Sequence, residues 1–238
     1  MLSIIVPVRN ESDYIASLYN YFLNSLKNID YEVLIINDFS DDNTFEQCLS
    51  LEKKDNRIKA LNNKKKGLGG AINLGIKKAS GNFVTIMMAD QSDDINDLIK
   101  YYESINEKSY DAILGSRFLK ESRVVNYPFQ KLILNRIFNF FVSIIFWNKY
   151  NDYTNAFKIY KKEVLIEIMP LISESFNIFL EIPLKIISRK HSYEITSINW
   201  YNRKLGAAKF NIKELRAKYL FTLIYCFIEK VLLNKKNK

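Results

Sequence analysis

Residues 31–43 decide the fold of this chain and read Tyr-Glu-Val-Leu-Ile-Ile-Asn-Asp-Phe-Ser-Asp-Asp-Asn. Residues 31–37 are an apolar run rich in β-branched side chains, which is typical of a strand buried on both faces, and residues 38–43 are an acidic loop. Four more segments of the first half have the same strand character, namely Leu2–Val8, Arg57–Leu61, Asn82–Met88 and Tyr110–Gly115.

Segments with helical spacing of apolar residues separate these strands. The expected helices are Ser12–Lys27, Asp41–Lys53, Gly67–Ala79 (which opens as a loop) and Asp94–Asn106. Buried strands that alternate with helices predict an α/β fold, in which a mostly parallel sheet is flanked by helices. Right-handed crossovers then place the carboxyl ends of the strands at one edge of the sheet.

Polar residues collect where the strands end. The four clusters are Arg9-Asn10-Glu11, Asp38 to Asp42, Asp90 to Asp94 and Ser116-Arg117. Ligands of open α/β sheets bind outside the carboxyl ends of the strands, so the clusters predict a binding site at this edge. The alternative is that loops are polar without further purpose.

Composition narrows the class of protein. The 238 residues include 35 Lys and Arg against 26 Asp and Glu, a net charge of +9, and 48% of the residues are hydrophobic. These values exclude a disordered or collagen-like chain, and two cysteines give no disulfide framework. One histidine leaves no basis for a multi-histidine zinc site. The positive charge favours an anionic partner such as a nucleotide or a phospholipid surface.

The second half of the chain is less regular. Its expected elements are an aromatic-rich helix Tyr127–Trp147, a strand Tyr153–Tyr160, helices Glu163–Met169 and Ser175–Arg189, a strand Ser192–Trp200, and an amphipathic helix Phe210–Leu233 with a basic tail. Neither apolar helix reaches the roughly 18–20 continuous apolar residues of a membrane span. We therefore expect both to lie on a membrane surface or to pack at a dimer interface. The N-terminal apolar run is expected to be a strand, not a signal peptide.

Asp90, Asp93 and Asp94 crowd the end of an apolar strand. Neighbouring carboxylates repel one another unless a cation or hydrogen-bond donors compensate, and Mg²⁺ and Mn²⁺ commonly use one or two carboxylates together with substrate phosphates. The alternative is that Ser92 or Asp93 caps the following helix. The two roles are also compatible, with Asp90 facing the ligand and Asp93 or Asp94 as the cap.

A glycine-rich loop, Gly67-Leu68-Gly69-Gly70-Ala71, follows three lysines and opens a helix. Glycines permit close backbone approach, and a helix N-terminus favours phosphate. The loop lacks the ending of a Walker A motif, and a flexible loop is the alternative reading.

Basic residues surround the apolar helices, which suits an amphiphilic phosphate whose tail lies on the apolar surface. Ordinary snorkelling of surface Lys and Arg is the alternative. These residues are Arg117, Lys131, Arg136, Arg203 and Lys209. Glu181 is an acid inside an apolar segment and needs a partner, either structural or functional.

The motifs resemble those of family-2 glycosyltransferases with the GT-A fold, in particular the polyprenyl-phosphate (dolichol-phosphate mannose synthase-like) branch. The resemblance runs from Ile4 to about Lys209. Its motifs are Val6-Pro7-Val8-Arg9-Asn10-Glu11, the segment Leu34 to Thr44, Lys66 to Ala71 with Asn73 and Gly75, Leu114-Gly115-Ser116-Arg117-Phe118, Asp152 to Lys158, and Arg203 with Gly206 and Lys209.

The resemblance implies a role for each matching residue. Pro7, Asn10, Glu11 and Asp38 would line the pocket of the donor nucleotide, with Gly67 and Gly69 at its phosphates. Asp90 would match the second acid of the D-x-D motif, which binds Mg²⁺ or Mn²⁺ and the donor pyrophosphate. The acceptor phosphate would be held by Arg117, Lys131 and Arg203, with Lys209 nearby.

The chain departs from the family pattern at several of these positions. Met88 stands where the first acid of D-x-D is expected, and Phe39 stands where glycine is usual. Asn155-Ala156 replaces Ser-Gly, Ala208 replaces a serine, and Lys131 replaces an arginine, which is a better bidentate partner for phosphate.

The resemblance implies an inverting, metal-dependent glycosyltransferase that moves a hexosyl group from a nucleotide-diphosphate sugar to a polyprenyl phosphate. We expect a GT-A domain over residues 1–209, a C-terminal helix and tail over 210–238, and peripheral association with the cytoplasmic face of the cell membrane. Asp90, Asp93 and Arg117 are the expected catalytic residues.

Three alternatives stay open. In the first, the acceptor is a saccharide hydroxyl of a surface polysaccharide, and Asp93 or Asp94 is the general base. In the second, the chain is a non-catalytic nucleotide-sugar-binding module, as Met88 suggests. The third concerns assembly, and in it the chain forms a homodimer. Nucleic-acid binding is not expected, because the basic residues form no continuous stripe and no reader motif is present.

Overall fold

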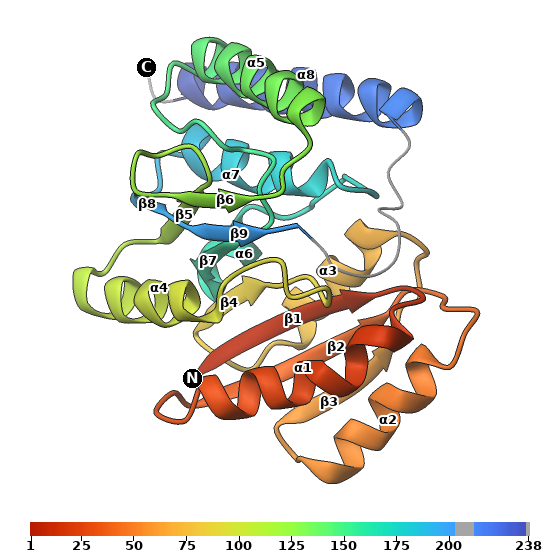
Figure 1. Cartoon of the computed structure of the whole chain (residues 1–238). Coiled ribbons are helices and arrows are strands. Elements are labelled where there is room, and N and C mark those ends of the chain that lie inside the picture. Colours follow the sequence, from red (N-terminus) through yellow and green to blue (C-terminus); the bar gives the residue numbers. More distant parts are fainter. Residues whose placement is uncertain (203–211, 237–238) are drawn as a thin grey trace.

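A computed structural model describes residues 1–202 and 212–236. Its main element is a seven-stranded sheet, shown in Figure 1. The strands are, in order across the sheet, β3 (Ile58–Asn62), β2 (Tyr31–Asn37), β1 (Leu2–Val8), β4 (Phe83–Ile86), β7 (Lys158–Lys161), β5 (Ala112–Ser116) and β8 (Tyr193–Ser197). The prediction of a mostly parallel α/β sheet is confirmed.

Strand β7 is the exception to the parallel arrangement. It runs antiparallel to β4 on one side and to β5 on the other. The five strands of the first half, β1 to β5, all run in one direction and end at one edge as expected, whereas β7 ends at the opposite edge. The predicted strand Tyr153–Tyr160 is also mostly loop, because only residues from Lys158 onward pair in the sheet.

Helices cover both faces of the sheet. One face is packed by α1 (Ser12–Ser25), α2 (Thr44–Lys54) and α4 (Ile95–Lys108), and the other by α3 (Leu68–Lys78), α6 (Lys162–Glu167) and α7 (Ile178–Ser188). Strands β1 and β2 are buried along their whole length, as their continuous apolar sequences predict.

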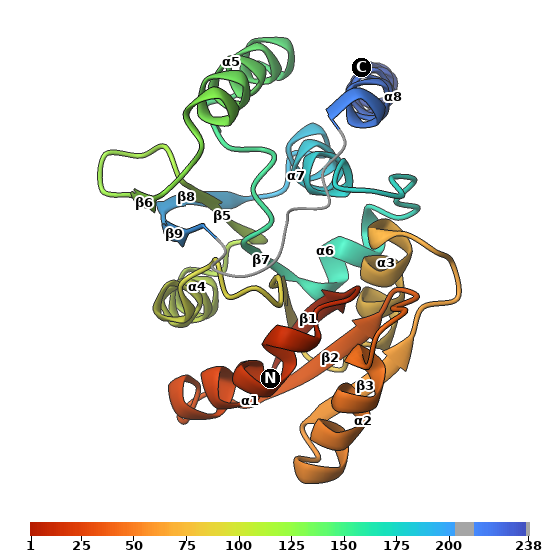
Figure 2. The same cartoon turned by 45° about the vertical axis from the view of Figure 1, so that its right-hand side comes forward.

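Two further helices lie outside α7. They are α5 (Phe129–Phe146) and α8 (Ile212–Lys236), and both views show them at the end of the molecule that is far from β2 and β3 (Figures 1 and 2). Helix α8 packs along α7. The expected division into a domain over residues 1–209 and a C-terminal helix and tail over residues 210–238 stays a prediction.

A small second sheet pairs β6 (Arg123–Val125) with β9 (Asn199–Tyr201). The predicted strand Ser192–Trp200 is thus two strands, because the chain leaves β8 after Ser197 and crosses to β6. Strand β9 also binds the loop after β4, since Tyr201 N donates to Ser92 O (2.8 Å) and Asp93 bridges to Trp200. This crossing brings Trp200 to the carboxyl edge of the main sheet.

Glu32, near the start of β2, connects several segments at the edge of the sheet opposite the carboxyl ends of the parallel strands. Its buried carboxylate accepts hydrogen bonds from Ser3 Oγ (2.7 Å), Lys59 Nζ (2.9 Å) and Ser80 N (2.5 Å). Burial alone would raise the pKa of Glu32, but these hydrogen bonds outweigh it and lower the pKa below its ordinary value of 4.5.

We therefore expect Glu32→Gln to destabilise the protein by about 1–3 kcal/mol at neutral pH. A carboxyl with a lowered pKa contributes stability above its ordinary value and loses it as the pH falls through the folded-state value. The difference between variant and wild type, measured by urea unfolding, should shrink in acid. A difference that is independent of pH would contradict the role of the charge.

Candidate functional site

The loops after β1 and β2 are hydrogen-bonded to each other at the carboxyl edge. Asn10 N donates to Ser40 Oγ (3.0 Å), and Asp41 N donates to Asn10 Oδ1 (2.8 Å). Glu11 N donates to Thr44 Oγ1 (2.9 Å). The structure thus brings the predicted nucleotide-pocket residues of these two loops together, whereas Pro7 is buried inside β1 opposite Ile36.

Asp38 links this edge to the glycine-rich loop. Its buried Oδ1 accepts hydrogen bonds from Gly67 N (2.8 Å) and from Asn63 Nδ2 (2.8 Å). Gly67 has a φ of +118°, a conformation that favours glycine. Sequence reasoning missed Asn63, although it is the polar residue directly after β3, where the other strands also place theirs.

Close backbone packing explains the glycine at position 69. A Cβ at Gly69 would lie 1.8 Å from Ser173 O, and Gly69 N donates to Glu174 O (3.1 Å). The start of α3 therefore packs directly on the segment before α7. Phosphate binding by Gly67 and Gly69 stays a prediction.

The carboxylates of the acidic loop after β4 have different roles: one caps helix α4, and the others lie at or near the pocket. Asp94 is the N-cap of α4 and accepts a hydrogen bond from Asn96 N (2.9 Å), so a capping role is confirmed, at Asp94. Asp90 is half-buried, and its Oδ1 accepts from Ser92 N (3.1 Å). Asp93 is buried and lines a pocket.

The Asp93 carboxyl is electrostatically unusual. Burial raises its pKa to about 7, Asp90 adds to the shift, and Arg117 and Lys158 oppose it. The ammonium of Lys158 is also completely buried, which lowers its pKa to about 7. Both groups can therefore change charge near neutral pH.

Few protein side chains are placed to hold the predicted metal ion. Within residues 1–202 and 212–236, no group of three or more His, Cys, Asp or Glu side chains is placed to hold a metal ion. Met88 contributes a thioether to the pocket wall instead of a carboxylate. Asp90 fits a Mg²⁺ or Mn²⁺ ion that takes its other ligands from a substrate diphosphate, but not an all-protein metal site.

A buried ion pair fixes Arg117. Its Nε and Nη2 donate to Asp152 Oδ2 (2.8 Å) and Oδ1 (2.7 Å), and its backbone N donates to Oδ2 (2.9 Å). Burial would lower the pKa of Arg117, but Asp152 outweighs this effect and raises it. Asp152 belongs to a motif visible in the sequence, yet its pairing with Arg117 joins segments 35 residues apart and has no local signal.

Aromatic rings surround this guanidinium. The Arg117 Cζ lies 5.4 Å from the ring centroid of Tyr127, 5.5 Å from Phe118 and 5.9 Å from Trp200. Lys131 Nζ lies 5.9 Å from the centroid of the same Tyr127 ring. Cations and aromatic rings thus alternate along the wall between α5 and the pocket.

Lys131 is electrostatically coupled to the pocket. Desolvation and the neighbouring Arg117 lower the pKa of Lys131, and Asp90 opposes this shift. The structure thus brings Lys131, Arg117 and Asp90 into one electrostatic group. The other two predicted phosphate ligands, Arg203 and Lys209, lie outside the residues that the structure describes.

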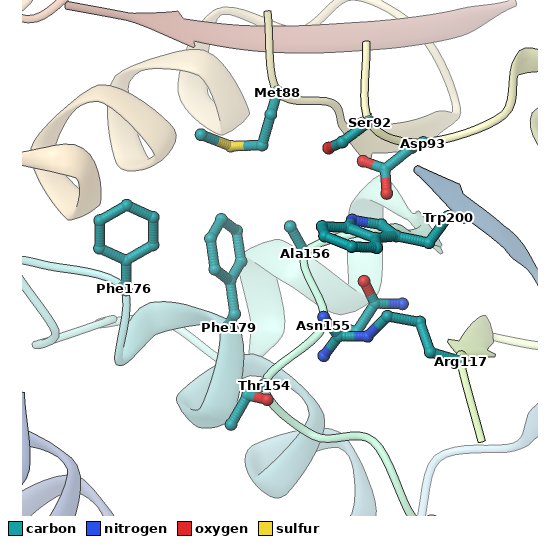
Figure 3. A pocket seen from close by; sticks show the side chains of 10 residues that line it. All are labelled: Met88, Ser92, Asp93, Arg117, Thr154, Asn155, Ala156, Phe176, Phe179 and Trp200. Atoms are coloured by element: carbon teal, nitrogen blue, oxygen red, sulfur yellow. The ribbon is translucent and has the colours of Figure 1, made fainter. Parts of the chain in front are cut away.

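The pocket itself lies among β4, β9, α7 and the loop before β7 (Figure 3). In the view of Figure 3 the Trp200 ring lies between the Asp93 carboxyl and the Arg117 guanidinium, while Met88, Phe176 and Phe179 form an apolar side. Its lining residues are Met88, Ser92, Asp93, Arg117, Thr154, Asn155, Ala156, Phe176, Phe179 and Trp200.

Glu181 has structural partners instead of a place in this pocket. It is buried, lies 3.2 Å from Lys185 Nζ, and accepts hydrogen bonds from the backbone of Ile172 and Ser173. The structural alternative for Glu181 is confirmed.

The sequence model of the family described as "Glycosyl transferase family 2" matches residues 3–169. The chain belongs to glycosyltransferase family 2. The match covers β1 to α6 and includes Asp38, Asp90 and Arg117.

Curated relatives are similar to this glycosyltransferase over most of its length. A dolichol-phosphate mannosyltransferase of Pyrococcus furiosus is 30% identical over 188 residues, which are 77% of this chain and 52% of the relative. The glycosyltransferase GlyG of Streptococcus pneumoniae is 27% identical over 71% of this chain and 59% of the relative. The chain therefore spans little more than half the length of these relatives.

Solved structures show the same fold. Glucosyl-3-phosphoglycerate synthase of Mycobacterium tuberculosis, in complex with Mn²⁺, UDP and glucosyl-3-phosphoglycerate, has a TM-score of 0.72 at 12% identity, over 95% of this chain and 79% of that chain. TarS of S. aureus (residues 1–349, with UDP) has a TM-score of 0.63 at 19% identity, over 97% and 65%. The predicted GT-A fold of this family-2 glycosyltransferase is confirmed.

We expect Asp152→Asn to destabilise the enzyme by about 3 kcal/mol or more, because it leaves the Arg117 guanidinium buried without its counter-charge. Chemical unfolding of the variant and of the wild type measures the difference. Glu174→Gln is the control, since Glu174 and its partner Lys65 form an ion pair in which both side chains are mostly exposed, and little stability should be lost. Equal losses in the two variants would contradict the special weight of the buried pair.

Proposed function

We propose that this family-2 glycosyltransferase transfers a sugar from a nucleoside-diphosphate sugar to a polyprenyl phosphate at the cytoplasmic face of a membrane. The observation that carries the proposal is the large exposed apolar surface of α5 and α8, which adjoins the cationic and aromatic wall of the pocket. The similarity to a dolichol-phosphate mannosyltransferase supports the same acceptor class.

The α5–α8 apolar surface consists of the exposed large hydrophobic side chains of the two helices. They are Phe129, Ile133, Leu134, Ile137, Phe140, Phe141, Ile144, Ile145 and Trp147 in and directly after α5, and Leu220, Phe221, Ile224, Phe227, Ile228, Val231 and Leu232 in α8. Contiguous exposed apolar patches of this kind mark interaction sites. By length and composition α5 could also cross a membrane, and only 17% of its apolar window is buried.

The opposite face of α8 is anchored in the protein. Thr222 Oγ1 accepts from Asn177 Nδ2 (2.9 Å), and Glu229 Oε1 accepts from the guanidinium of Arg189 (2.7 Å). Cys226 is completely buried between these contacts. Because one face of α8 is fixed to α7, its apolar face is presented outward.

Trp147 supports the proposal that a lipid surface covers this region. It ends α5 with a φ of +53°, and its side chain is 92% exposed. A bulky residue in this conformation is strained, and tryptophan is enriched where proteins meet the headgroup region of a membrane. Lys149, two residues after Trp147, is also exposed, and each lysine near an anionic leaflet adds about 1 kcal/mol of attraction.

A phosphate acceptor suits the chemistry of the pocket. Its oxygen is already an anion at neutral pH, so attack on the sugar requires no strong general base. Arg117, held by Asp152, and the nearby Lys131 would bind and orient this oxygen, and Arg203 would complete the group. Asp90 would hold a Mg²⁺ or Mn²⁺ ion, whose charge would stabilise the departing diphosphate.

A saccharide hydroxyl is the second candidate acceptor, and Asp93 is the observation in its favour. A buried carboxyl with a pKa of about 7 is suited to accept a proton from a hydroxyl group. The non-catalytic alternative rests on Met88 alone.

We expect purified enzyme with Mg²⁺ or Mn²⁺, undecaprenyl phosphate and labelled nucleotide sugars to release label into an organic extract. Arg203→Ala should reduce kcat/KM about 30-fold or more, because a charged hydrogen bond worth roughly 2 kcal/mol is lost. Asp93→Asn should keep much of the activity.

The reverse pattern would reject the phosphate acceptor in favour of a hydroxyl acceptor. Nucleotide binding without turnover on any acceptor would favour the non-catalytic alternative.

We expect the enzyme to float with liposomes that contain anionic lipid, and Phe140→Glu/Phe141→Glu to abolish flotation, since it places two charges on the α5–α8 apolar surface. Ile166→Glu is the matched control, because Ile166 is also exposed but lies on α6. A wild type that does not float, and a dimer that the double variant disrupts, would assign the surface to a homodimer.

A further inference from the structure

Phe39 combines a strained backbone with an exposed ring. It follows β2 directly after Asp38 and has a φ of +56°, although it carries a bulky side chain. This conformation is unfavourable for residues with a Cβ, and bulky residues adopt it only when the surroundings impose it. Phe39 is 44% exposed, so the ring is only partly buried and a large part of its surface stays in contact with solvent.

Other left-handed residues at this edge have local compensation. Asn10 ends β1 with a φ of +51°, and its side chain accepts a hydrogen bond from Asp41 N. Gln91 follows β4 with a φ of +54° and donates to Ser17 Oγ (2.7 Å). For the Phe39 ring, the contact that the structure shows is the Lys66 ammonium, 5.9 Å from its centroid. Asn37 Oδ1 accepts from Ser40 N (3.2 Å) and supports the turn that contains Phe39, but this contact does not involve the ring. A bulky residue that keeps a strained backbone with its ring partly in solvent is a candidate functional residue.

The position of Phe39 is set by the donor side of the site. Asp38 on one side binds Gly67 N, and Ser40 on the other side binds Asn10 N. Phe39 therefore stands between the loop after β1 and the loop that opens α3. These are the loops at which the proposed donor nucleotide binds.

We propose that the exposed ring of Phe39 stacks on the nucleobase of the donor. This inference rests on the proposed nucleoside-diphosphate donor. Every nucleobase offers a flat π-face, and aromatic side chains stack on such faces without reading base identity. Phe39 thus supplies affinity for the nucleoside part of the donor, and the neighbouring loops supply selectivity between bases.

The test compares Phe39→Gly, Phe39→Leu and Phe39→Tyr with the wild type. Calorimetric titration with Mg²⁺ and UDP, GDP, CDP, ADP or TDP identifies a nucleoside diphosphate that the wild type binds. Inorganic pyrophosphate is the control ligand, because it shares the diphosphate and lacks the base. Thermal unfolding of each variant reports the strain.

We expect Phe39→Gly and Phe39→Leu to weaken binding of the nucleoside diphosphate about tenfold or more, and to leave pyrophosphate binding unchanged. Phe39→Tyr should bind like the wild type. The Tm of Phe39→Gly should equal or exceed that of the wild type, because glycine relieves the strain.

Unchanged nucleoside-diphosphate affinity in a folded Phe39→Gly variant overturns the inference and leaves the proposed function intact. A lower Tm for this variant also overturns it, since the ring would then stabilise the fold. A wild type that binds none of the five nucleoside diphosphates removes the proposed donor, and the stacking inference with it.

Discussion

The buried ion pair between Arg117 and Asp152 holds together the part of the protein in which the chain leaves its regular alternation of strands and helices. Two charges removed from water are tolerated only with good geometry, and here three hydrogen bonds from Arg117 satisfy one carboxylate. The pair ties the end of β5 to the loop before the reversed strand β7. This loop forms one wall of the pocket, and the rings packed around Arg117 form the next.

The first half of the fold could be predicted from the sequence because its signals are local. A parallel strand that is buried on both faces has a continuous run of apolar residues in the sequence. Because the crossovers between such strands are right-handed, the polar residues that follow the strands lie at one edge of the sheet. Asp38 and the loop of Asn10 therefore lie at the expected edge of the sheet, whereas their role in donor binding stays a prediction. Asn63 was missed because one amide after a short strand carries no pattern, although its contact with Asp38 shapes the same edge.

The second half could not be predicted in the same way because its contacts join distant segments. The direction of β7 depends on pairing with both β4 and β5, and a four-residue strand has no sequence signature of direction. Trp200 reaches the pocket because the chain leaves the main sheet after β8 and pairs with β6 as strand β9. The sequence shows that α5 is apolar, but it does not show whether other elements cover the helix. In the structure, α7 and α8 leave most of the surface of α5 exposed.

Asp93 connects the electrostatics of the pocket to the choice of acceptor. A permanently charged carboxylate in this wall would repel an incoming phosphate and would favour a neutral hydroxyl acceptor. Burial and the neighbouring Asp90 raise the pKa of Asp93 to about 7, so protonation removes the charge at little cost near neutral pH. Arg117 remains charged because Asp152 raises its pKa. The pocket therefore keeps its cation while its acid can become neutral, which is the balance that an anionic acceptor requires. The same titration would let Asp93 accept a proton from a hydroxyl, so the adjoining apolar surface, and not the carboxyl, favours the lipid phosphate.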